Sequence, residues 1–150
     1  MRFFLSGKRG FYTGENPATV TFEGANGSTF AIKSKMVDHT LSTGSTTSTV
    51  SGLFTDGMLV LAVVARTLKT IVASTQTTIA LSDGAANWFS KATLTAGTTY
   101  TQADATAIAY PKYYAAPADG TLTVSGGSGN ITAGQMRIVV YYVDVAAPTC

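Results

Sequence analysis

The only histidine of the chain, His39, directly follows Asp38 in a stretch rich in serine and threonine. A histidine oriented by a carboxylate can act as the general base for a serine nucleophile, so these residue types could support hydrolysis. A catalytic triad is defined by its geometry, however, and a chain with many hydroxyl groups contains its components by chance. We therefore interpret His39 as an exposed residue ahead of a Ser/Thr-rich linker, and we predict no catalytic residue and no enzymatic activity.

The eight acidic residues are scattered, and three of them, Asp56, Asp83 and Asp119, precede a glycine. Asp-Gly pairs are typical of turns. A calcium site would need several oxygen ligands close together in sequence, and a zinc site would need more than one histidine and one cysteine, Cys150. No spacing of carboxylates indicates glycoside hydrolysis. The sequence therefore predicts no metal site and no cofactor.

The glycine-rich segment SGGSGNITAG (125–134) lacks the Gly-Lys-Ser/Thr ending of a phosphate-binding loop, and no helical pattern follows it. We predict a β-turn here. The net charge of +2 is spread thinly, with no basic run beyond Lys8-Arg9, whereas nucleic-acid binding requires concentrated Lys and Arg. We therefore expect neither a nucleotide nor a nucleic acid as a partner.

Aromatic side chains in the second half of the chain could stack on sugar rings. Trp88, Tyr113 and Tyr114 are the candidates for this role, with Asp83 or Asn87 available to bind sugar hydroxyls. Packing at sandwich edges or at subunit contacts is the alternative for the same aromatic residues, and we favour it. A glycan site stays as the competing hypothesis.

Strand patterns dominate the chain, and helical periodicity is nearly absent. Residues 18–35 alternate between apolar and polar on either side of Asn26-Gly27, which predicts a β-hairpin. The segment 40–52 has no apolar periodicity before Val50 and predicts a flexible connection. Short strands and turn-forming groups beyond it indicate an antiparallel β-sandwich or jelly roll. The predicted strands are 58–68, 69–74, 77–81, 92–95, 121–125 and 135–145.

The composition, with 45% hydrophobic and only 12% charged residues, argues against disorder and against a well-charged monomer surface. A single cysteine cannot form an internal disulfide. The start MRFFLSGKRG lacks the apolar core of about 7–15 residues that a signal peptide needs. The longest apolar run, MLVLAVVA (58–65), is far shorter than the ~20 residues that span a bilayer. We therefore expect synthesis in the cytosol without a membrane anchor.

Two predicted strands are apolar on both faces. In 58–65, Met58, Val60, Ala62 and Val64 are assigned to one face, and the residues between them, on the other face, are also apolar; the strand 135–145 shows the same property. An antiparallel sheet can leave one face in water, but these strands need cover on both. Since no helix is available, we predict that another copy of the chain or a larger surface covers the second face, and hence a homo-oligomer.

Three segments share their composition and layout with a known family: GMLVLAVVARTLKTIVAS (57–74), TTIALSDGAANWFSKATLTAGTTY (77–100) and GTLTVSGGSGNITAGQMRIVVYYVDV (120–145). The region 57–145 resembles virion β-sandwich proteins of tailed bacteriophages, especially capsid decoration (cement) proteins. The resemblance implies a non-enzymatic sandwich, often trimeric, that binds the outside of an icosahedral head and reinforces it, often through an extended terminal arm.

We accordingly expect an arm, residues 1–50, with the hairpin and linker, and a sandwich domain, residues 51–150. The expected role is a structural virion protein on the capsid surface, made in the host cytoplasm. Its expected partners are itself, as a trimer, and the major capsid protein, with no membrane and no small-molecule substrate. The alternative is a glycan-binding module of a phage tail, head fibre or adhesin. The residues expected at core or oligomer contacts are Met58, Val60, Val139, Tyr141 and Val143. Those expected in the arm that meets the capsid are Arg2, Lys8, Arg9 and Phe11.

Overall fold

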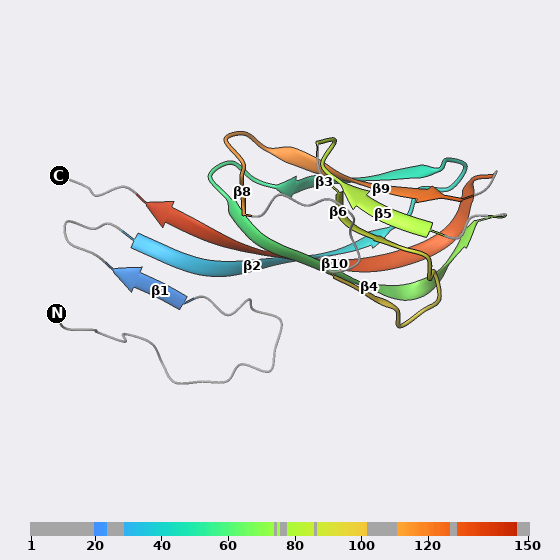
Figure 1. The fold of residues 1–150 in the computed structure, drawn as a ribbon, viewed down its shortest axis with the longest axis horizontal. Coiled ribbons are helices and arrows are strands. Elements are labelled where there is room, and N and C mark those ends of the chain that lie inside the picture. Colours follow the sequence, from blue (N-terminus) through green and yellow to red (C-terminus); the bar gives the residue numbers. More distant parts are fainter. Residues whose placement is uncertain are drawn as a thin grey trace.

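In the computed structural model, the chain forms two antiparallel sheets packed as a sandwich (Figure 1). The structure describes residues 20–23, 29–73, 75, 78–85, 87–101, 111–126 and 129–146. These residues form strands, turns and bends, without a helix. The predicted all-β sandwich with an N-terminal hairpin is thereby confirmed. Within the described ranges, no helix has the length and apolar character that crossing a bilayer would require.

The strands are divided between a larger and a smaller sheet. The larger sheet contains, in spatial order, β1 (Val20–Glu23), β2 (Thr29–Thr40), β10 (Ile131–Ala146), β4 (Leu59–Ala73) and β7 (Thr99–Tyr100), and β8 (Lys112–Tyr113) also pairs with β4. The smaller sheet contains, in spatial order, β3 (Thr47–Phe54), β9 (Ala118–Ser125), β5 (Thr78–Ser82) and β6 (Asn87–Lys91). Figure 1 shows β4 curving around the smaller sheet, so that the outer side of the larger sheet is convex along this strand.

The core lies between the two sheets. Strand β9 alternates as its sequence predicts, because Leu122 and Val124 are buried while Thr121 and Thr123 lie on the other side. The largest side chains of the core are Trp88, Tyr100, Phe54 and Phe89, all fully buried. Together with the buried Tyr114, these rings fill the space between the two sheets.

Strand β4 does not keep the simple alternation that the run 58–65 predicts. Val60 and Val63 are both fully buried, although the alternating pattern assigns them to opposite faces. The register against β10 shifts at this point, since Tyr141 pairs with Ala62 and Tyr142 with Val60. A β-bulge of this kind adds one residue and reverses the alternation beyond it. The predicted faces were therefore correct only for Met58–Val60, and a second shift lies near Leu68.

Two strands that begin before residue 50, β2 and β3, belong to the two sheets of the sandwich. Strand β2 pairs with β10 from Thr29 to Thr40, and β3 forms one strand of the smaller sheet. The segment expected to be a flexible linker thus contains a strand. The sequence pattern does not reveal this strand, because Ser48 fills an inward position that usually carries an apolar residue. The predicted strands 58–68 and 69–74 form one strand, and 92–95 is a loop after β6.

Candidate functional site

His39 does not form a catalytic triad with its neighbours. It is half-buried near the end of β2, and its Nε2 lies 2.7 Å from the hydroxyl of Ser48 on β3. Ser48 is buried and accepts a hydrogen bond of 2.8 Å from the Ser42 N–H. Asp38 lies on the opposite face of β2 and binds Arg137 at 2.6 and 2.7 Å. His39 and Ser48 therefore tie the two sheets together, and the buried hydroxyl is closed to a substrate.

A lysine makes a second tie between the same two strands. Lys35 shares the inner face of β2 with His39, and its Nζ donates to the carbonyl oxygen of Gly52 at 2.5 Å. Since β2 and β3 lie in different sheets, these two contacts close the sandwich along one side. Polar residues that the sequence analysis assigned to an arm and a linker thus connect the two sheets of the sandwich.

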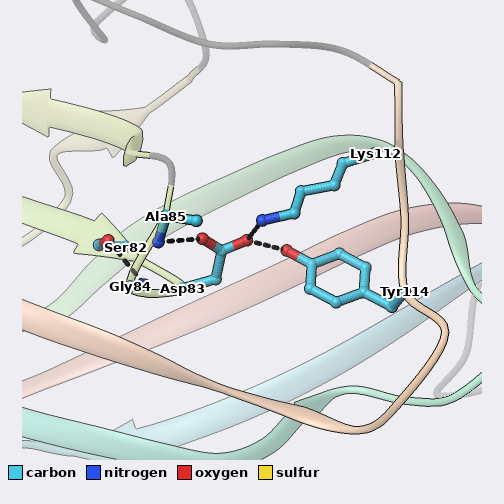
Figure 2. A network of polar contacts seen from close by, with 6 residues as sticks. All are labelled: Ser82, Asp83, Gly84, Ala85, Lys112 and Tyr114. Carbon is cyan, nitrogen blue, oxygen red and sulfur yellow. Dashed lines mark hydrogen bonds and ion pairs between the residues drawn. The ribbon is translucent and has the colours of Figure 1, made fainter.

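The buried carboxylate of Asp83 holds the loop around β8 against the turn between β5 and β6 (Figure 2). Its side chain is only 1% exposed. The Nζ of Lys112 and the hydroxyl of Tyr114 both donate to Oδ2, while the Ala85 N–H donates to Oδ1 at 3.0 Å. The ammonium also lies 5.1 Å from the Tyr114 ring centroid. Asp83 therefore acts as a structural anchor, beyond the turn role that its Asp-Gly pair predicts.

Two of the three aromatic residues considered for sugar stacking are buried. Trp88 is fully buried and stacks on Phe54 with ring centroids 5.4 Å apart, and Tyr114 stacks on the same Phe54 at 4.4 Å. Neither ring presents a face to a ligand. Tyr113 is 56% exposed, but with Trp88 and Tyr114 buried the three candidates do not form the aromatic platform of the competing glycan hypothesis.

The outer side of the larger sheet is apolar across three strands. Paired residues of an antiparallel sheet point to the same side, and the pairing therefore defines rows that run from β2 through β10 to β4. These rows are Met36 with Val139 and Val64, Ser34 with Tyr141 and Ala62, and Ile32 with Val143, Leu59 and, on β8, Tyr113. Together with Phe30 and Leu61, we call these residues the apolar outer face.

The large side chains of this face are open to solvent. Met36 is 50%, Tyr141 42%, Phe30 41% and Ile32 38% exposed. Scattered apolar residues are normal on a protein surface, but a contiguous apolar patch marks an interaction site. The apolar outer face is therefore the candidate functional site of the chain.

The outer side of the smaller sheet has the opposite character. Thr47 pairs with Thr123 and Thr49 with Thr121 across β3 and β9, and these hydroxyl-bearing side chains point away from the core. Such alternation of apolar and polar residues is typical of a sheet with one wet face. The two outer sides thus differ, and only the larger sheet presents its apolar residues on both sides.

Cationic side chains gather at one end of the apolar outer face. Arg66 lies directly opposite Arg137, and Lys69 lies opposite Gln135. Arg137 is paired with Asp38, and this contact lowers the pKa of the Asp38 carboxyl, mainly through the hydrogen bond. We call Arg66, Lys69 and Arg137 the cationic end. Sequence reasoning missed this cluster because the pairing of β4 with β10 joins residues that are far apart in the chain.

The residues expected at core or oligomer contacts fall into two groups. Met58 and Val60 lie in the core, with exposures of 3% and 0%. Val139 and Tyr141 lie on the apolar outer face, and Val143 belongs to it but is only 3% exposed. The residues expected in the capsid-contacting arm, Arg2, Lys8, Arg9 and Phe11, lie outside the described residues.

A metal site and a known relative are the other possible sources of a functional assignment. No group of three or more His, Cys, Asp or Glu side chains that could hold a metal ion occurs among them. Comparisons of the chain with protein-family models, with curated proteins and with solved structures gave no match. We therefore infer function from the geometry of the apolar outer face.

Proposed function

We propose that this protein is a structural virion protein of the capsid decoration type, which binds the outer surface of a phage head as a homo-oligomer and stabilises it. The observation that carries the proposal is the apolar outer face, which one copy of the chain leaves open. The resemblance of residues 57–145 to decoration proteins supplies the setting, including a trimer as the expected oligomer. The low share of charged residues, 12%, also suits a protein that works within an assembly.

The energetics of the face favour repeated contacts. Fully burying a large apolar side chain contributes about 1.5–3 kcal/mol, so covering the exposed two-fifths of each contributes roughly 1 kcal/mol. Covering all six large side chains of this face would contribute about 6 kcal/mol to binding; they are Phe30, Ile32, Met36, Leu61, Tyr113 and Tyr141. Association itself costs about 4–15 kcal/mol. One such face alone therefore binds weakly, whereas an oligomer that engages several sites at once gains affinity through multivalency.

The alternative, a glycan-binding module, has less support. Its aromatic platform needs exposed rings, and Trp88 and Tyr114 are buried in the core. No other described contact favours a sugar as the ligand.

Native mass spectrometry of the free protein and co-sedimentation with intact heads test the proposal. We expect a homo-oligomer that sediments with the heads. The double variant Met36→Ser and Tyr141→Ser should weaken binding to the heads by about tenfold or more, since it removes roughly 2 kcal/mol of apolar contact. The matched control, Thr49→Ser with Thr121→Ser on the smaller sheet, should bind the heads normally. A monomer that stays in the supernatant would contradict the proposal.

A further inference from the structure

The cationic end is not neutralised by its own face. Asp38 is the acidic side chain that the described part of this face provides, and it already makes two hydrogen bonds to Arg137. Among the described residues, neither Arg66 nor Lys69 forms an ion pair. Like charges directly opposite each other in a sheet are unfavourable, and the pair of Arg66 with Arg137 is of this kind. The cationic end therefore gains most from carboxylates supplied by a partner.

The same face of a second copy does not supply them from its described residues. In a face-to-face pair, the second copy would bring the same three cations and, among the described residues of this face, Asp38, which is already occupied by Arg137. Such a pair would bury the apolar rows, but the described residues of this face in the second copy would bring no free carboxylate to Arg66 and Lys69. Electrostatic complementarity is a main source of specificity at interfaces, and this face lacks it toward itself.

Lysine and arginine can reach lipid headgroups while their stems lie along apolar residues, so a lipid surface is the competing occupant that the experiment below separates from a protein. A nucleic acid fits poorly. A nucleic acid needs cations along its whole track, whereas here they occupy one end and the other rows are apolar.

We propose that the apolar outer face and the cationic end form one docking surface for a protein that presents an apolar patch with carboxylates at one end of it. This inference rests on the proposed function, in which that protein is the capsid. Arg66 and Lys69 would bind the carboxylates, while Met36, Tyr141 and their neighbours would cover the apolar patch. The partner's acidic residues would then fix the direction in which the sandwich sits.

Charge reversal tests this proposal in the full-length protein. The variant Arg66→Glu with Lys69→Glu should bind intact heads about tenfold or more weakly, because like charges would then face the carboxylates. Lys91→Glu changes a cation of β6 in the smaller sheet and should bind like the wild type. Raising NaCl from about 0.01 M to about 1 M shortens the screening length from about 30 to about 3 Å, and it should weaken only the proteins that keep both cations. Circular dichroism and native mass spectrometry confirm folding and oligomer size.

Each other outcome overturns the proposal in a recognisable way. If binding to heads changes neither with salt nor with charge reversal, the partner does not bind through carboxylates, and the proposed function stands. A charge-reversed protein that loses its own oligomer identifies a second copy as the occupant. Equal sedimentation of the wild type with phosphatidylserine vesicles identifies a lipid surface. If no form of the protein binds heads at low salt, the proposed function fails together with the inference.

Discussion

At the scale of single residues, Asp83 carries a carboxylate that is almost fully shielded from solvent. Its Oδ2 accepts hydrogen bonds from Lys112 and Tyr114, which lie on the loop around β8 (Figure 2). Two donors and a buried charge make the position sensitive to substitution, because each group that loses its partner stays poorly solvated. The loop is therefore held by chemistry that an Asp-Gly turn alone does not predict.

We expect Asp83→Asn to lower the free energy of unfolding by about 2–4 kcal/mol, because it leaves the Lys112 ammonium without its counter-charge. Lys112 is 28% exposed, so solvent compensates part of the loss. Urea denaturation measures the effect. The control is Asp38→Asn, whose pair with Arg137 is exposed and screened by solvent, so its loss should lower the stability much less. Equal effects of the two substitutions would contradict the assigned role of Asp83.

His39 should make the stability of the fold depend on pH. Burial lowers the pKa of His39 below its ordinary value of 6.5. The folded chain then binds fewer protons than the unfolded chain, so the contribution of His39 is complete above about pH 6.5 and is lost as the pH falls below it. We expect lower stability at about pH 5 than at about pH 7.5, measured by urea denaturation. His39→Gln should flatten this difference, and an unchanged slope in the variant would contradict the assignment.

At the scale of elements, the bulged part of β10 depends on a glycine. Gly134 has a φ of +149°, and a Cβ at this position would lie 3.1 Å from the Cα and 3.0 Å from the Cγ1 of buried Ile71 on β4. Close approach of the two backbones therefore needs a residue without a side chain. The irregular register between these strands lies in the same region.

Gly134→Ala should destabilise the protein by roughly 1–3 kcal/mol, since the new methyl group meets backbone atoms that cannot move freely. Thermal unfolding followed by circular dichroism measures this loss. Gly57→Ala provides the matched control, because Gly57 also has a positive φ, +79°, but nothing lies within 4 Å of the added atom. The control retains only the backbone strain, so an equal loss in both variants would remove the role of the contact with Ile71.

The elements show which parts of the fold the sequence could predict. In β9, Leu122 and Val124 alternate with threonines, and period-two reasoning assigns both faces correctly. In β4 an unbroken apolar run hides the bulge at Leu61, because every position there is compatible with either face. Strand β3 was taken for a linker because a buried serine, Ser48, occupies a core position. The pairing that creates the cationic end is non-local, and no short-range pattern contains it.

At the scale of the whole molecule, the two outer sides of the sandwich differ in polarity. The threonines of the smaller sheet face solvent, while the larger sheet presents the apolar outer face and the cationic end. The strands that are apolar on both sides were predicted to need cover beyond a single chain. Met58 and Val60 lie in the core of the same chain, so they need no such cover. The exposed rows around Met36 and Tyr141 are what a partner would cover.

Site-specific thiol labelling tests most directly whether assembly covers the apolar outer face. In a Cys150→Ser background, Met36→Cys places one thiol on this face, and Thr49→Cys places one on the smaller sheet as the control. The free protein and the head-bound protein are each treated with a maleimide, and the labelling rates are compared. We predict that binding slows the reaction at position 36 by about tenfold or more, as burial on association would, and leaves position 49 unchanged. Equal rates at position 36 in the free and bound forms would contradict the account.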